Sequence, residues 1–162
     1  MHPVIIVRHP KERLSKCSLR PLEGCAGFTF HKATPRFSLD VAGCLLLEVG
    51  APVLTPDVRT NPETGQPRPL ILLDSTWRLL PGLEACLVNR AQAIPVGLPA
   101  GIATAYPRVS KLAADPAGGL ASVEALYVAL RLLGVACADL LEAYHWREPF
   151  LAGLETHPAF NQ

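Results

Sequence analysis

The sequence has no apolar run long enough to cross a bilayer, which takes about 18 consecutive apolar residues. Its first ten residues are too polar for a secretory signal. There is no CxxC pair, and the five histidines are scattered without the spacing of metal ligands. We therefore expect a cytoplasmic protein that spans no membrane and holds no metal.

The short motifs of several common enzyme families are absent as well. No GxGxxG follows an expected strand, and there is no GxxxxGK[ST], HExxH or GxSxG. These absences argue against a dinucleotide-binding, P-loop, zinc-hydrolase or α/β-hydrolase site of the usual kind.

Cysteine is present in a number and spacing that argue against a disulfide framework. The five residues are odd in number and widely separated, at Cys17, Cys25, Cys44, Cys86 and Cys137. We expect reduced thiols that are mostly buried.

The composition is that of a folded chain. Of 162 residues, 49% are hydrophobic and 18% charged, which predicts a packed core and argues against disorder. Sixteen prolines predict many short turns and few long helices.

Charge is unevenly placed along the chain. Residues 1–36 carry seven basic and two acidic side chains, or +5, whereas the remaining residues carry eight basic and twelve acidic, or −4. This asymmetry indicates an RNA- or DNA-facing N-terminal part, and a solvated basic face without a partner is equally compatible with it.

Strand and helix patterns alternate, which predicts an α/β fold with a mostly parallel sheet in the second half. Expected strands are 3–7, 28–30, 44–49, 70–73 and 93–96, and expected helices are 77–87, 120–133 and 136–146, with a short last turn at 150–154. Thr76 is the expected N-cap of the first helix, and Gly134 the expected stop of the second. The polar segment 59–69 predicts a boundary between domains 1–60 and 61–162.

The strand expected at 70–73 ends in Asp74-Ser75-Thr76-Trp77. Ligands of open α/β sheets bind at the carboxyl ends of the strands, where Asp74 would emerge. Asp74 would offset a positive charge and Trp77 would pack on an apolar or cationic group, so S-adenosylmethionine (SAM), with its sulfonium and ammonium, is a suitable cofactor. A helix-capping Asp74 and a core Trp77 are the simpler alternative.

Asp74-Ser75-Thr76-Trp77 resembles the D-x-T-W motif of DTW-domain proteins, which are tRNA-uridine aminocarboxypropyltransferases. It is also similar to the D-C-S-W motif of the small-subunit rRNA aminocarboxypropyltransferases of archaea and eukaryotes. Further segments resemble motifs of the rRNA family in the same order, namely Lys16-Cys17-Ser18, Val53-Leu54-Thr55-Pro56-Asp57, Leu120-Ala121-Ser122-Val123-Glu124-Ala125 and Leu140-Leu141-Glu142-Ala143-Tyr144-His145-Trp146.

The resemblance implies a small N-terminal α/β domain and a SPOUT-like C-terminal domain with a trefoil knot that binds SAM. It implies transfer of the 3-amino-3-carboxypropyl group to a uridine-type nitrogen in rRNA or tRNA by a monomer. The cofactor would contact Ser18, Leu73, Asp74, Trp77, Leu98, Tyr106 and Ser122. Asp74 is also the candidate acceptor of the proton from the base. The basic residues expected to hold RNA are Lys11, Arg13, Lys16 and Arg20.

Two other functions stay open at this point. One is a SPOUT-type RNA methyltransferase, and the other is an RNA-binding ribosome-assembly module without catalysis. The adenine loop of the rRNA family, A-N-P-V-N-Y-G, corresponds here only to Ile102-Ala103-Thr104-Ala105-Tyr106-Pro107-Arg108. That departure and the mixed D-x-T-W and rRNA-like motifs leave the RNA substrate undecided.

Overall fold

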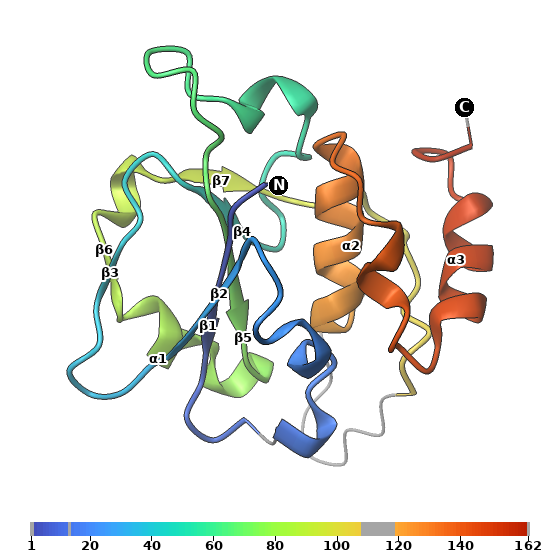
Figure 1. Ribbon diagram of the computed structural model, residues 1–162, viewed down its shortest axis with the longest axis horizontal. Coiled ribbons are helices and arrows are strands. Elements are labelled where there is room, and N and C mark those ends of the chain that lie inside the picture. Colours follow the sequence, from blue (N-terminus) through green and yellow to red (C-terminus); the bar gives the residue numbers. More distant parts are fainter. Residues whose placement is uncertain (1, 13, 108–118, 162) are drawn as a thin grey trace.

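A five-stranded parallel sheet forms the centre of the protein in a computed structural model that describes residues 2–12, 14–107 and 119–161. The strands lie in the order β2-β1-β5-β4-β7, and every neighbouring pair is parallel. A smaller parallel pair, β3 with β6, lies to one side (Figure 1). The strands are β1 (Val4–Arg8), β2 (Phe28–Lys32), β3 (Leu39–Asp40), β4 (Leu45–Leu47), β5 (Leu70–Asp74), β6 (Leu87–Val88) and β7 (Ile94–Val96).

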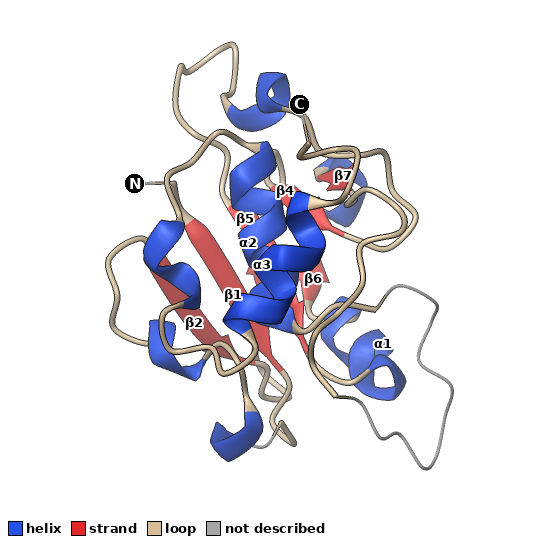
Figure 2. Cartoon of the chain, turned by 90° about the vertical axis from the view of Figure 1, so that its right-hand side faces the viewer, coloured by secondary structure: helices blue, strands red, loops and turns tan. Residues whose placement is uncertain are grey.

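The helices lie on both sides of the sheet, with α2 and α3 together on one side and α1 near β3 and β6 on the other (Figures 1 and 2). The α-helices are α1 (Leu80–Glu84), α2 (Ser122–Leu132) and α3 (Arg147–Glu155). The 3₁₀ turns are η1 (Leu14–Lys16), η2 (Arg20–Leu22), η3 (Pro56–Arg59), η4 (Trp77–Leu79), η5 (Arg90–Gln92) and η6 (Ala138–Leu141).

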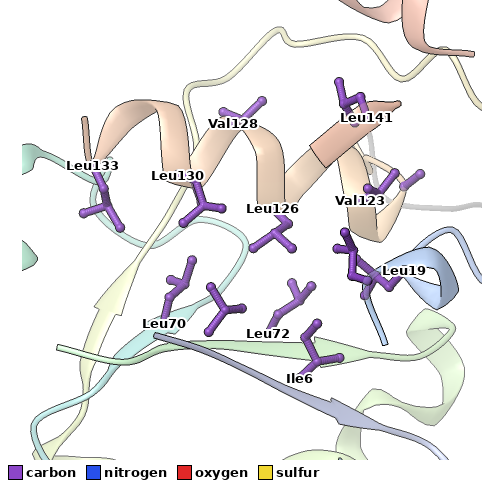
Figure 3. Packing of buried hydrophobic residues seen from close by; sticks show 14 of the residues in the cluster. Ile6, Leu19, Leu70, Leu72, Val123, Leu126, Val128, Leu130, Leu133 and Leu141 are labelled. Atoms are coloured by element: carbon purple, nitrogen blue, oxygen red, sulfur yellow. The ribbon is translucent and has the colours of Figure 1, made fainter. Parts of the chain in front are cut away.

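The strand alternation decides which side chains meet α2. Val4, Ile6, Leu70 and Leu72 belong to the same buried cluster as Leu126, while Ile5, Val7, Ile71 and Leu73 pack in clusters on the opposite face. In Figure 3 Leu126 and Leu130 of α2 point toward Ile6, Leu70 and Leu72, whereas Val128 points away from the sheet. The helix runs antiparallel to β5, so its N-terminal end lies at the carboxyl edge of the sheet.

Several expected elements are confirmed with small shifts in their ends, including the strands at β1, β2, β4, β5 and β7 and the helix at α2. Gly134 ends α2 as predicted, with φ of +65°, and the amide of Val135 donates to the Leu130 carbonyl at 2.9 Å. Pro81 lies at the start of α1, where its missing N–H leaves no bond unmade.

The prediction for 136–146 is wrong: only η6 forms there, and the chain then turns. Leu141 and Tyr144 are both buried, and the Tyr144 hydroxyl donates to the Glu124 carboxylate at 2.9 Å. These tertiary contacts override the helical spacing. The short turn expected at 150–154 is instead the nine-residue α3, which accommodates Pro149 in its first turn and buries Phe150 and Leu154.

Three smaller expectations are corrected. The helix predicted over 77–87 is divided into η4 and α1; Thr76 occupies the N-cap position of η4 as predicted, but its side chain makes no capping hydrogen bond. The five cysteines are free, but only Cys44 is buried, so the prediction of mostly buried thiols is wrong.

The segment predicted as a linker folds back on itself between η3 and β5, since Thr60 pairs with Pro67 and the Arg68 amide donates to the Arg59 carbonyl at 2.8 Å. The prediction of a parallel sheet in the second half of the chain is too narrow, because the sheet takes β1, β2 and β4 from 1–60 and β5 and β7 from 61–162. The division into two domains at residue 60 stays a prediction.

Candidate functional site

Three charged side chains lie in a row at the carboxyl edge of the sheet, each from the last residue of its strand. Arg8 of β1 is the register partner of Lys32 on β2 and of Asp74 on β5. The alternation that points Ile6 and Leu72 toward α2 puts these three on the same face. This row is the centre of the candidate site, and it follows from a register of parallel strands that the sequence does not show.

Asp74 is held from three directions. It is 4% exposed, and its Oδ2 accepts hydrogen bonds from Arg8 Nε at 2.9 Å and from Cys17 Sγ at 3.2 Å. Its Oδ1 accepts from Ser122 Oγ at 2.9 Å. The carboxylate therefore joins β1, the segment after η1, and the first residue of α2.

Arg8 connects that carboxylate to the edge of the sheet. Its Nη1 donates to the Glu23 carboxylate, its Nη2 donates to Cys17 Sγ at 3.1 Å, and its guanidinium lies 5.0 Å from the centre of the Phe30 ring. Burial lowers the pKa of Arg8, but the hydrogen bonds to Glu23 and Asp74 outweigh burial and raise it overall. Arg8 therefore stays charged inside the fold.

Cys17 acts in this cluster as a neutral donor. Burial and the neighbouring negative charge of Asp74 raise the pKa of its thiol to about 11. A thiol that keeps its proton at neutral pH can donate to the Asp74 carboxylate, and it is a poor nucleophile there.

A second buried carboxylate, Glu124, ties the loop around 104–106 to the start of α2. The side chain is fully buried and accepts from Thr104 Oγ1 at 2.6 Å, from the Ala105 amide at 2.9 Å and from the Ala121 amide at 2.8 Å. The Tyr144 hydroxyl is its fourth donor. Four donors offset the burial of the charge and fix the loop in one place.

The predicted cofactor residues fall into two groups. Ser18, Asp74 and Ser122 come together, since Ser18 Oγ accepts from the Val123 amide at 3.2 Å beside the Ser122–Asp74 bond. Within the described residues, no hydrogen bond or ring contact joins Trp77, Leu98 or Tyr106 to that group.

Those remaining residues lie in distinct surroundings. Trp77 is half-buried at the start of η4, three residues after Asp74. Leu98 and Tyr106 are partly buried against the main core, where Tyr106 meets the Trp146 ring edge-on at 4.8 Å between ring centres. The Leu73 side chain packs on the opposite face of the sheet, so only the Leu73 backbone can contact a ligand at the site.

The predicted RNA-binding residues are only partly described. Lys11 and Arg20 are exposed. Lys16 is the last residue of η1, and Arg13 lies outside the described residues.

Sequence reasoning missed Arg8, Glu23 and Glu124 as members of the site. For Arg8, a signal was available in the two-residue spacing of a strand, which places Arg8 on the same face as Val4 and Ile6 and at the strand end. Glu124 lay inside a matched motif, but its role as a clamp depends on the loop that folds back onto it. Glu23 lies 15 residues from Arg8, and no local pattern pairs the two.

No group of three or more His, Cys, Asp or Glu side chains suited to a metal ion occurs among the described residues. In the same part of the chain, no helix combines the length and the apolarity that a membrane crossing requires.

Comparison with known proteins finds a similar fold in one solved structure. That structure is described as the SAM-dependent rRNA:acp-transferase Tsr3 from Vulcanisaeta distributa. The match has a TM-score of 0.65 and 20% sequence identity, and covers 94% of this chain and 78% of the other. No family model matches the sequence. No curated protein matches it either.

Proposed function

We propose that the chain is a SAM-dependent RNA aminocarboxypropyltransferase that modifies a uridine-type nitrogen in rRNA or tRNA. The observation that carries the proposal is the meeting of Ser18, Asp74 and Ser122 at the carboxyl edge of a parallel sheet. These residues come from three of the motifs that resemble this enzyme class, and the fold is similar to that of an rRNA:acp-transferase.

The charge of the cluster fits a cofactor with a cationic centre. Arg8 is paired with both Asp74 and Glu23, so the pairs leave one negative charge in excess. A sulfonium or an α-ammonium placed beside them would be stabilised, and more so in partly buried surroundings than in water.

We assign the amino-acid end of SAM to Ser18, Asp74, Trp77 and Ser122, and the ribose to the backbone at Leu73. The adenine would lie near Leu98 and Tyr106. The Glu124 clamp supports this arrangement because it holds residues 104–106 against the start of α2. A SPOUT-like domain with a trefoil knot belongs to the same proposal.

SAM supplies an activated carbon next to its sulfonium, so the protein contributes mainly alignment, which is worth several kcal/mol. The side chains that hold the amino-acid end would decide which carbon faces the RNA nitrogen. Asp74 stays the candidate proton acceptor, but its three donors make orientation of the site its better-supported role. RNA as partner, with Lys11, Arg13, Lys16 and Arg20 as contacts, and a cytoplasmic monomer complete the proposal.

Calorimetry with SAM tests the cofactor. The native chain should bind SAM, and Trp77→Ala should weaken binding at least about tenfold if the ring packs on a cationic or apolar group. The exposed neighbour Arg78 provides the control, since Arg78→Ala should leave SAM affinity unchanged. Absence of SAM binding by the native chain would refute the proposal.

Mass spectrometry of RNA incubated with the protein and SAM tests the reaction. A gain of the aminocarboxypropyl mass is the expected result. A gain of the methyl mass instead would identify an RNA methyltransferase. RNA binding without any SAM dependence or mass gain would identify a non-catalytic module.

A further inference from the structure

A pocket of about 420 Å³ opens at the carboxyl ends of β1 and β2, on the far side of Arg8 from β5. Small-molecule sites commonly have volumes of about 300–1,000 Å³, so a single nucleotide fits a pocket of this size. Arg8, Glu12, Leu14, Glu23, Phe30 and Lys32 are among the residues that line it.

Arg8 forms a shared wall between this pocket and the Asp74 cluster. It is 8% exposed, bonds Asp74 through Nε and Glu23 through Nη1, and also lines the pocket. Its register partner on the pocket side is Lys32. A ligand in the pocket would therefore lie next to the end of the proposed cofactor site where the transferred group is placed.

The lining combines apolar surface with exposed charge. Phe30 is half-buried, and Leu14 is 48% exposed. Together, these two side chains form a partly apolar surface on which a planar nucleobase can pack. Lys32 is exposed at the strand end and suits a phosphate.

Glu12 supplies an acceptor on the same pocket. Among the described residues, its carboxylate has no hydrogen bond or ion pair, although it is half-buried. Burial and the negative charge of Asp74 raise the pKa of Glu12. A half-buried carboxylate without a donor is the group that a ligand N–H would satisfy.

We propose that this pocket receives the acceptor nucleotide and selects a uridine-type base, with Glu12 accepting the ring N–H, Phe30 and Leu14 contacting the base, and Lys32 binding its phosphate. This inference rests on the proposed function, specifies its acceptor, and gives Glu12 rather than Asp74 the contact with the ring N–H whose nitrogen the proposed reaction modifies. Uracil presents an N–H donor between two carbonyls, whereas cytosine has an unprotonated nitrogen at the same place. A carboxylate therefore favours uracil over cytosine.

Saturation-transfer NMR with the full chain tests the pocket, using uridine 5′-monophosphate and cytidine 5′-monophosphate as probes. The native chain should prefer the uridine nucleotide by about tenfold, the scale of a charge-assisted hydrogen bond. Glu12→Gln should remove that preference. Lys32→Ala should weaken both nucleotides about equally, by roughly threefold, because it removes an exposed charge contact.

Arg36→Ala is the matched control, since Arg36 is an exposed basic residue of the same N-terminal part that does not line the pocket. Its nucleotide affinities should equal those of the native chain. The inference is overturned by native binding that is absent or equal for the two nucleotides, by an unchanged preference in Glu12→Gln, or by a Lys32→Ala effect no larger than the control.

Calorimetry with SAM on the same variants separates this inference from the proposed function. Glu12→Gln and Arg36→Ala should bind SAM as the native chain does. If the native chain does not bind SAM but still shows the expected nucleotide preferences, the proposed transferase function is refuted and the nucleotide pocket is not.

Discussion

The chain carries a buried basic side chain near each end of β1, and the two have unlike surroundings. His2, two residues before the strand, is 2% exposed, and neither ring nitrogen has a hydrogen-bond partner among the described residues. Arg8, at the other end, is 8% exposed and donates to Asp74, Glu23 and Cys17.

The difference follows from the chemistry of the two side chains, because histidine can release its proton when buried and arginine cannot. Histidine can be buried as the neutral ring, and burial together with the nearby charge of Arg59 lowers the pKa of His2. Arginine keeps its charge, so its burial requires acceptors. Charge is therefore retained inside the protein at the carboxyl edge, where the candidate site lies, and is avoided at the amino edge.

Removing Arg8 should have the largest effect. Arg8→Met would leave the Asp74 carboxylate buried without its cationic partner, and the free energy of unfolding should fall by about 3 kcal/mol or more. Urea denaturation measures this. Arg20→Met, at an exposed basic residue, should stay within about 0.5 kcal/mol of the native chain. Equal stability of the two variants would contradict the role given to Arg8.

The Glu124 clamp should come next. Glu124→Gln keeps the size of the side chain but offers one acceptor oxygen to four donors, so we expect a loss of about 2 kcal/mol or more. Glu142→Gln, at an exposed glutamate, is the matched control. SAM affinity should also fall in Glu124→Gln. If SAM affinity is unchanged, the loop at 104–106 does not contribute to cofactor binding.

Lowering the pH should reduce the stability of the protein through His2, at the amino edge of the sheet. Because the pKa of His2 is lowered in the folded state, the unfolded chain binds a proton more readily, and stability falls as pH drops below about 6.5. One such group changes the free energy of unfolding by at most about 1.4 kcal/mol per pH unit. Denaturation between pH 7 and 5 should show a shallower pH dependence in His2→Phe than in the native chain. Parallel curves would show that His2 does not titrate differently on unfolding.

The smallest effect is expected at Cys17. Its thiol donates to Asp74 and accepts from Arg8, so Cys17→Ala should cost about 1 kcal/mol. The exposed Cys25 gives the control, because Cys25→Ala should leave stability nearly unchanged. A cost at Cys17 no greater than at Cys25 would place the thiol outside the network.

The sequence allowed most elements of the fold to be predicted where a local pattern was strong. The apolar run at 70–73 and the spacing of 123, 126 and 130 predicted β5 and most of α2, and Gly134 predicted where α2 ends. The prediction failed at 136–146, where the Tyr144 hydroxyl reaches a buried carboxylate 20 residues away. The local spacing of apolar residues does not predict a contact between residues so far apart in the sequence.

By itself, the sequence determined that β1 and β5 are continuous apolar runs buried on both faces and that Asp74 follows such a run, because hydrophobicity is a local property. Only the tertiary structure decided that Arg8 lies between Lys32 and Asp74, and that Ser18 and Ser122 meet beside them. Strand register and the packing of α2 join residues up to about a hundred positions apart, and their free energy depends on the assembled core.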